Sequence, residues 1–191
     1  MIVIYILAYA LILGFFLVER FVRRGKDTKN MDRTEHDRGS TTFVSFAMGT
    51  TFVLLLAAPF FIWLRIAMLN CLWLSVIGLA LGAGGLAVRA SAFTTLGRFF
   101  SRTLRGAEGH TLVKTGVYRY IRHPGYLSDF MIFIGAALAL GNLILIIAVP
   151  VLFIPAYIYR IRVEEKMLVE LFGQQYIEYM KTSKRLIPFV L

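Results

Sequence analysis

Two short segments in the second half of the chain concentrate the residue types that could do chemistry. The first is 110–126, HTLVKTGVYRYIRHPGY, which holds two of the three histidines together with arginines and tyrosines. The second is 160–165, RIRVEE, which carries two cations and two adjacent carboxylates directly after a long apolar stretch. Polar groups at the edge of an apolar stretch need partners from protein, water or a ligand. Both segments are therefore candidate binding segments.

The end of the first segment predicts an unusual backbone. A proline disfavours the helical conformation of the residue before it, so Pro124 predicts an extended His123. Gly125 would permit a sharp turn, which would leave the backbone groups of 123–126 available to a ligand. The alternative is an anchor at the membrane interface, with the tyrosines in an aromatic belt and the arginines on lipid headgroups. The residues alone favour neither, and no metal site is indicated because the histidines and the single cysteine lack ligand spacing.

The second segment has two interpretations as well. Arg160 and Glu164 are four residues apart, so they share one face of a helix. They could form a surface ion pair, which would contribute little to stability. They could instead line a site in which Arg160 binds a substrate carboxylate and Glu164 binds a cationic or hydroxyl-bearing group of a cofactor. Asp129 is the other ionisable group nearby, and it either reaches the membrane interface or lines the same site.

The elements that carry these segments are predicted to be membrane helices. Hydrophobic residues make up 58% of the chain, and its mean hydropathy is +0.71, more than a soluble domain needs. About 20 residues cross a bilayer, so the longest apolar region, 126–159, is divided at Gly141-Asn142, a turn signal. The sequence thus predicts an all-α integral membrane protein with five transmembrane helices, the last two a helical hairpin. The expected spans are Met1–Val18, Phe43–Leu64, Ile66–Val88, Leu127–Leu140 and Leu143–Tyr159.

Three further features complete the expected architecture. Gly78 and Gly82 are spaced for close packing between membrane helices. Apolar residues recur at helical spacing over Arg160–Lys181, which predicts an amphipathic helix at the membrane interface, with Gly173 as a possible break. No Gly-x-Gly-x-x-Gly follows a strand, so no Rossmann domain is expected.

The distribution of charge predicts the orientation. Of the 21 Lys and Arg residues, seven lie in 19–42, seven in 89–125 and six in 160–191. Cytoplasmic loops are enriched in these residues, and five spans with the N-terminus outside place all three groups in the cytoplasm. The net charge of +10 is therefore assigned to topology and to anionic membrane lipids. No nucleic-acid partner is expected, because no recognised binding module is present.

The strings GVYRYIRHPGY and RIRVEEKMLVELFGQQYIEYM, with the Gly-Asn hairpin between them, resemble the isoprenylcysteine carboxyl methyltransferase family, within a wider group that includes phospholipid methyltransferases. The resemblance covers about 110–189 and rests on three motifs in order: Arg-His-Pro-x-Tyr, a double glutamate after the last span, and Phe-Gly-x-x-Tyr-x-x-Tyr. One departure is that 102–105 lacks the glutamine that the eukaryotic enzymes place before this loop.

The resemblance implies S-adenosylmethionine as the cofactor and a methyltransferase site. It implies Arg160 and Glu164 as catalytic residues, Arg160 on the substrate and Glu164 on the cofactor. The other implied cofactor-binding residues are His110, Thr111, Leu112, Val113, Tyr118, His123, Pro124, Gly125 and Tyr126. One membrane domain is expected, with transmembrane helices and cytoplasmic loops in 1–109, and the cofactor loop, hairpin and C-terminal helix in 110–191.

The resulting hypothesis is an enzyme that methylates the carboxylate of a lipid-linked, isoprenylcysteine-like substrate, either a small molecule or a prenylated peptide, from an active site facing the cytoplasm. An amine of a phospholipid, or another lipid nucleophile such as a thiol, is the alternative acceptor. Less favoured are an NADPH-dependent sterol-type reductase, which usually has more spans, and a non-enzymatic membrane protein.

Overall fold

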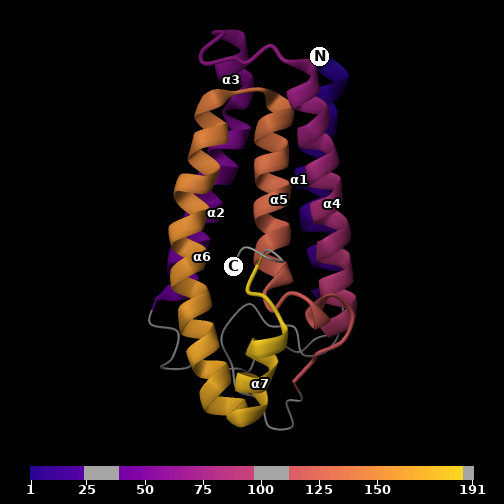
Figure 1. The fold of residues 1–191 in the computed structure, drawn as a ribbon. Helices are drawn as coiled ribbons and strands as arrows, with labels where there is room; N and C mark the ends of the chain where they lie inside the picture. The colour runs from indigo at the N-terminus through magenta and orange to yellow at the C-terminus, as the bar shows by residue number, and fades with distance from the viewer. Residues whose placement is uncertain (24–38, 97–111, 187–191) are drawn as a thin grey trace.

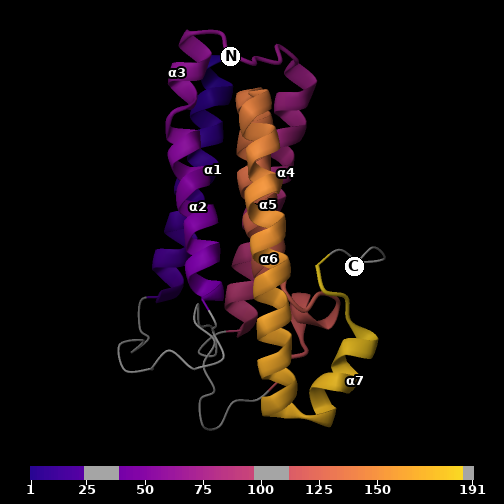
Figure 2. The ribbon, with the colours of Figure 1, turned by 90° about the vertical axis from the view of Figure 1, so that its left-hand side faces the viewer.

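The computed structural model describes residues 1–23, 39–96 and 112–186. Within these ranges the regular elements are helices, and no strand occurs beyond two isolated bridges. The long helices run side by side, and the last short helix lies beyond one end of the bundle (Figures 1 and 2). The elements in order are α1 (Ile2–Arg23), α2 (Ser40–Leu56), α3 (Ala58–Trp63), α4 (Leu72–Leu96), η3 (Gly116–Arg119), α5 (Pro124–Leu140), α6 (Leu143–Phe172) and α7 (Gln174–Thr182).

Four helical stretches of the described residues are long and apolar enough to cross a membrane: Ile2–Phe21, Ser40–Trp63, Leu72–Leu96 and Leu143–Phe172. The remaining apolar helix, α5, has 17 residues. At 1.5 Å per residue it is about 26 Å long, slightly less than the ~30 Å hydrocarbon core. The protein is an integral membrane protein with several apolar helices, and the first arm of the hairpin is short, as the sequence predicted.

The boundary between the second and third predicted spans was wrong. α2 ends at Leu56, α3 follows to Trp63, and α4 begins only at Leu72 rather than at Ile66. In the connection between them, Arg65 and Ala67 both adopt left-handed backbone conformations with φ of 53°. Hydropathy did not reveal the length of this connection, because most of its residues are apolar and only Arg65 and Asn70 interrupt them.

The prediction that a separate amphipathic helix begins at Arg160 was also wrong. α6 continues without interruption from Leu143 to Phe172, so 160–172 is the last part of the final long helix. The chain breaks at Gly173, with φ of 54°, and α7 follows. Tyr176 and Tyr179 of α7 are buried. At least part of the apolar face of α7 therefore packs against the protein, and its contact with a membrane surface stays a prediction.

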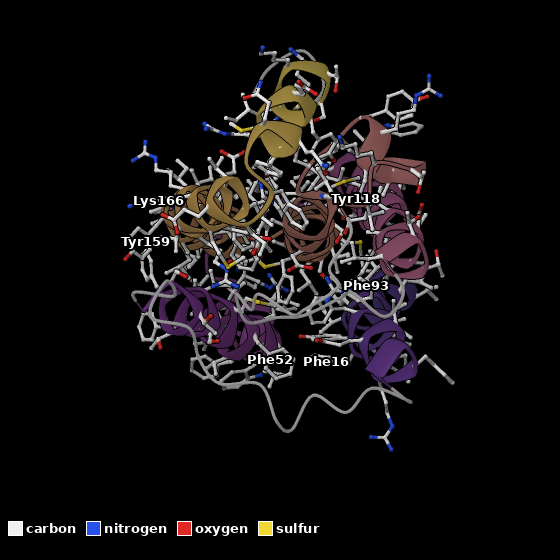
Figure 3. All side chains as sticks on the ribbon, turned by 90° about the horizontal axis from the view of Figure 1, so that it is seen from below. Phe16, Phe52, Phe93, Tyr118, Tyr159 and Lys166 are labelled. Carbon is white, nitrogen blue, oxygen red and sulfur yellow. The ribbon has the colours of Figure 1, made fainter. Side chains whose placement is uncertain are left out.

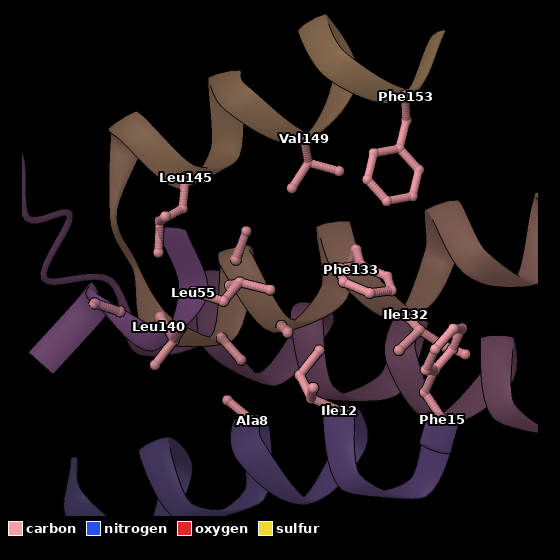
Figure 4. Close-up of a cluster of buried hydrophobic side chains, with 14 of the residues drawn as sticks. Ala8, Ile12, Phe15, Leu55, Ile132, Phe133, Leu140, Leu145, Val149 and Phe153 are labelled. Carbon is pink, nitrogen blue, oxygen red and sulfur yellow. The ribbon is translucent and has the colours of Figure 1, made fainter. Parts of the chain in front are cut away.

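α5 is the centre of the bundle, although with 17 residues it is only as long as α2 and shorter than α1, α4 and α6 (Figures 1 and 3). Ten of its residues are buried. Its Ile132, Phe133 and Leu140 meet side chains from α1, α2 and α6 in the main apolar core (Figure 4). On the α4 side the two backbones approach closely, because a Cβ added at Gly78 would lie 2.6 Å from the backbone oxygen of Gly135. The close packing predicted from the glycine spacing is confirmed.

The hairpin turn is where the sequence predicted it, at Gly141 and Asn142. Gly141 has φ of 63° and ends α5, and the Asn142 side chain accepts a hydrogen bond from the backbone of Leu145 at the start of α6. The turn also binds the α3–α4 connection, since Leu69 N donates to Gly141 O (2.7 Å) and Asn142 Nδ2 donates to Ile66 O (2.9 Å). These hydrogen bonds therefore hold the α5–α6 turn and the α3–α4 connection together, at the end of the bundle away from α7.

Candidate functional site

Tyr126 joins the two candidate segments at the α7 end of the bundle. It lies in the first turn of α5, and its hydroxyl donates to Glu164 Oε2 (2.5 Å) and accepts from Arg160 Nε (3.0 Å). Arg160 is 3% exposed. A charge buried to this degree is costly unless hydrogen-bonded, and the arrangement excludes the exposed surface ion pair that the spacing alone allowed.

The guanidinium of Arg160 is also held by the start of α2. Its Nη1 donates to Ser40 Oγ (2.8 Å) and to Thr41 Oγ1 (2.9 Å). These residues are about 120 positions away in the chain, and the sequence analysis did not find them. No motif connects them with Arg160; the packing of α2 against α6 brings them together (Figure 2).

His123 lies directly before α5 and is 4% exposed. Its ring stacks on that of Tyr126, with centroids 5.7 Å apart and an interplanar angle of 23°. Its Nδ1 is 3.9 Å from Glu164 Oε2, and its Nε2 is 3.4 Å from Glu165 Oε1. The imidazole thus lies between the two glutamates.

The two adjacent glutamates have different environments. Glu165 is buried and accepts hydrogen bonds from Arg122 Nε (3.0 Å) and Arg185 Nε (2.9 Å). Glu164 contacts Tyr126 and keeps 25% of its side chain exposed. Glu165 is therefore occupied by ion pairs within the protein, whereas Glu164 is accessible to a ligand.

The segment after α7 pairs with the loop that precedes α5. Arg122 N donates to Lys184 O (2.7 Å), Lys184 N donates to Tyr120 O (2.9 Å), and His123 N donates to Arg185 O (3.1 Å). The hydroxyl of Tyr179 donates to the backbone oxygen of Tyr118. Burial raises the pKa of Tyr179 to about 12, so this hydroxyl keeps its proton at physiological pH. The loop is held in place by the C-terminal segment.

The backbone predicted for 123–126 differs from the observed one. His123 has φ of −122° but ψ of only 57°, and Gly125 lies inside the first turn of α5 without a positive φ. The groups expected to be available are partly used, because His123 O accepts from Leu127 N and Gly125 O from Ser128 Oγ. The positive φ in this region belongs to Gly116, at 57°. Side chains, more than backbone groups, therefore define this part of the site.

Of the other predicted site residues, Leu112 and Val113 are half-buried, and His110 and Thr111 lie outside the described residues, as does 102–105. Tyr118 is half-buried, and burial, with the nearby charge of Glu164, raises the pKa of its hydroxyl well above the usual value. Seen from the α7 end, Tyr118 lies on the inner side of the α7 region, whereas Tyr159 and Lys166 project outward from α6 (Figure 3).

Asp129 lies inside the helix bundle rather than on its surface. It is buried, forms an ion pair with Arg89 of α4, and accepts a hydrogen bond from the Tyr157 hydroxyl (3.3 Å). The ring of Tyr157 lies 5.0 Å from that of Tyr126, which connects this buried pair to the site. The sequence analysis singled out Asp129 but missed Arg89, because an arginine near the end of an apolar helix usually marks only a span boundary.

Comparison with known proteins finds similarity to the same family that the sequence motifs resemble, the isoprenylcysteine carboxyl methyltransferases. The profile of the isoprenylcysteine carboxyl methyltransferase (ICMT) family matches residues 76–170. The chain is 43% identical over 119 residues to the protein-S-isoprenylcysteine O-methyltransferase of Saccharomyces cerevisiae, covering 61% of this chain and 49% of the yeast protein. It is 35% identical over 120 residues to that of Xenopus laevis, covering 62% and 42%.

A solved structure extends the likeness to the fold. The eukaryotic intramembrane Ras methyltransferase ICMT superposes with a TM-score of 0.62 and 29% identity, over 92% of this chain and 61% of that one. The chain is thus similar to the isoprenylcysteine carboxyl methyltransferase family in sequence and in fold. It spans about half the length of the curated relatives given above. The match to the isoprenylcysteine carboxyl methyltransferase profile includes Tyr126, Arg160 and Glu164, but not Ser40, Thr41 or Arg185.

The side chains at the site suit the cofactor that the isoprenylcysteine carboxyl methyltransferase family implies. S-adenosylmethionine has a positively charged sulfonium, a ribose with hydroxyl groups and an adenine ring. The partly exposed carboxylate of Glu164 matches the positive and hydroxyl groups, and the half-buried ring of Tyr118 offers an aromatic surface. A buried guanidinium, Arg160, lies next to them and matches an anionic acceptor.

Proposed function

We propose that this protein is an S-adenosylmethionine-dependent methyltransferase that methylates the carboxylate of a lipid-linked, isoprenylcysteine-like substrate at the membrane. The observation that supports this most is the pairing of Arg160 and Glu164 through Tyr126 at the α7 end of the bundle. One cation suited to a carboxylate and one carboxylate suited to a cationic cofactor are thereby held a single side chain apart. The similarity to the isoprenylcysteine carboxyl methyltransferase family supports the same reaction.

The division of work between the residues follows from the chemistry. When bound, the cofactor supplies an electrophilic methyl group on a sulfonium that is also the leaving group. A carboxylate acceptor is ionised at neutral pH, so the protein needs no general base. Its task is to align the acceptor with the methyl group and to exclude water. In this proposal Arg160 orients the acceptor carboxylate, while Glu164 holds positive or hydroxyl groups of the cofactor.

The remaining cofactor contacts are proposed from the loop before α5 and from its first turn. Tyr126 and His123 would form one side of the cofactor site, since both rings lie against Glu164. The full set proposed for the cofactor is His110, Thr111, Leu112, Val113, Tyr118, His123, Pro124, Gly125, Tyr126 and Glu164. We infer that the segment after α7 holds this loop in its binding conformation.

We infer a five-crossing topology with the N-terminus outside and the site facing the cytoplasm. α5 would be the short crossing, surrounded by the other helices. The basic residues that follow α1, α4 and α6 would then lie on the cytoplasmic side, against anionic membrane lipids. A soluble cofactor would enter from the cytoplasm and a prenylated peptide or similar lipid-linked acid from the bilayer. Nucleic acid has no place in this proposal.

Transfer of labelled methyl groups tests the proposed function. The purified protein in lipid nanodiscs is given methyl-labelled S-adenosylmethionine with either a farnesylated cysteine or phosphatidylethanolamine. We expect label in the farnesylated cysteine, released as methanol by mild base because the product is an ester. Label confined to the phospholipid and resistant to base would show an amine acceptor instead.

Variants connect that activity with the proposed site. We expect Glu164→Gln and Arg160→Gln each to lower kcat/KM at least 100-fold, because each removes a charge that touches cofactor or acceptor. The control is Glu170→Gln, on the same helix, whose partner Lys166 is exposed. The site assignment fails if the Glu164 and Arg160 variants retain the activity of this control.

A further inference from the structure

The start of α2 contributes two hydroxyl groups to the site, although it lies outside the region matched by the family profile. Ser40 and Thr41 are the first two residues of α2, and Gly39 before them has φ of 77°. As the N-cap residue, Gly39 has no side chain that could cap this helix. Hydroxyl groups at a helix start commonly accept hydrogen bonds from backbone N–H groups. Here the hydroxyls of Ser40 and Thr41 instead accept from the guanidinium of Arg160.

The geometry of these bonds controls the direction in which Arg160 points. Nη1 binds both hydroxyls, at 2.8 Å and 2.9 Å, and Nε binds Tyr126 at 3.0 Å. Two edges of a planar guanidinium are thus held by groups from different helices, so the plane cannot rotate without losing a bond. Hydroxyl groups are uncharged, so they orient the cation without neutralising it.

The burial of these residues supports a role in the site. Ser40 is fully buried, and Thr41 is half-buried, whereas the next residue, Thr42, is exposed. α2 packs along α6, so the position of its first turn is fixed relative to Arg160. An arginine that binds a carboxylate through paired hydrogen bonds needs this kind of fixed plane, because the interaction is strongly directional.

We infer that Ser40 and Thr41 are positioning residues for the acceptor: they hold the Arg160 guanidinium in the orientation that receives the acceptor's carboxylate. This inference rests on the proposed function. It assigns part of the acceptor specificity to α2, so that discrimination between an acid and its neutral counterpart depends on a helix remote from the family's motifs. The two hydroxyls touch neither acceptor nor cofactor in this scheme and act through Arg160.

The test is discrimination between a farnesylated cysteine and its carboxamide, which lacks the negative charge. Binding of both is measured by competition in nanodiscs, alongside KM, kcat and the Kd of S-adenosylmethionine. Thr41→Val removes the hydroxyl while keeping the shape of the side chain, and Ser40→Ala removes the other. Thr42→Val is the matched control, and Thr41→Ser restores the hydroxyl.

We expect Thr41→Val and Ser40→Ala each to weaken binding of the acid, and to raise its KM, by roughly 5- to 20-fold. This is near the lower end of the effect of losing a hydrogen bond to a charged group, because the other hydroxyl and Tyr126 still hold Arg160. Affinity for the carboxamide and for S-adenosylmethionine should stay unchanged, Thr42→Val should match the wild type, and Thr41→Ser should recover most of the loss.

Two results would overturn the inference alone. In the first, the wild type binds the acid more tightly than the carboxamide, and Thr41→Val and Ser40→Ala keep the same ratio of the two affinities. The other is a parallel loss of affinity for acid, carboxamide and cofactor, which would show a merely structural role. A wild-type protein that neither methylates the acid nor prefers it to the carboxamide would overturn the proposed function, and this inference with it.

Discussion

Glu164 and Glu165 show how neighbouring residues of one type acquire different roles. Successive side chains on a helix point about 100° apart, so the pair cannot share one environment. Glu165 points to Arg122 and Arg185, which belong to the loop before α5 and the segment after α7. Glu164 points to Tyr126 and is the accessible one. The double glutamate thus combines a structural ion pair with a candidate ligand-binding group.

This difference predicts opposite consequences for two matched substitutions. Glu165→Gln should lower the free energy of unfolding by roughly 2–4 kcal/mol, because it leaves a buried arginine without its charged partner. Glu164→Gln should leave the stability within about 0.5 kcal/mol, as is usual away from buried pairs, while weakening S-adenosylmethionine binding. Thermal unfolding in detergent and equilibrium binding of labelled cofactor measure the two effects. Equal loss of stability in both variants would contradict the division of roles.

Among the elements, α4 and α5 form the closest contact in the bundle. The backbones of Gly78 and Gly135 are so near that a side chain on either would overlap the other helix. In lipid, helices gain little from excluding water, so association depends on close packing of this kind. α5 begins with Tyr126 and α4 carries Arg89, the partner of Asp129. Their separation therefore affects the site as well as the core.

Substitution of one glycine tests this contact. A Cβ at Gly78 would lie 2.6 Å from backbone atoms of both Ala139 and Gly135, which cannot move aside as a flexible side chain could. Gly78→Ala should therefore destabilise the protein by about 1–3 kcal/mol and lower its thermal unfolding temperature. Gly49→Ala is the control, since nothing lies within 4 Å of the added atom. It should be neutral or slightly stabilising through its better helix propensity.

At the scale of the whole molecule, the two ends of the helix bundle carry different elements. One end holds the N-terminus, α3 and the turns around Leu69 and Gly141, and the other holds α7 and the candidate site (Figures 1 and 2). The described ends of α1 and α4, after which two of the basic segments continue, lie at the second end, and the proposed topology places this end in the cytoplasm. The single cysteine, Cys71, is exposed and lies at the first end.

Labelling of Cys71, which is the natural residue, tests the proposed orientation of the protein in the membrane. We expect a membrane-impermeant maleimide to modify Cys71 in intact cells, because the α3–α4 connection should face outward. A Cys71→Ser variant that also carries Lys181→Cys, in α7, should react only after the membrane is permeabilised. The reverse pattern would show that the site faces outward and would contradict the topology.

The sequence by itself determined the class of structure and part of the site. Apolar length specifies membrane helices because a bilayer sets how many residues cross it, and Gly141-Asn142 identified the hairpin because few residues suit such a turn. The ordered motifs singled out Arg160 and Glu164 as candidate site residues. They did not reveal that Glu165 pairs with Arg122 and Arg185, because residue type and spacing do not say which partner a side chain meets.

The tertiary structure decided what depends on contacts between distant segments. Ser40 and Thr41 reach Arg160 only because α2 packs along α6, and Arg89 meets Asp129 only because glycines let α4 approach α5. The backbone of 123–126 departed from the local expectation because helix α5 and the segment after α7 use its hydrogen-bonding groups. Buried backbone N–H and C=O groups need hydrogen-bond partners, and a partner from a distant segment can override the conformation that the local sequence favours. Such partners become known only from the fold.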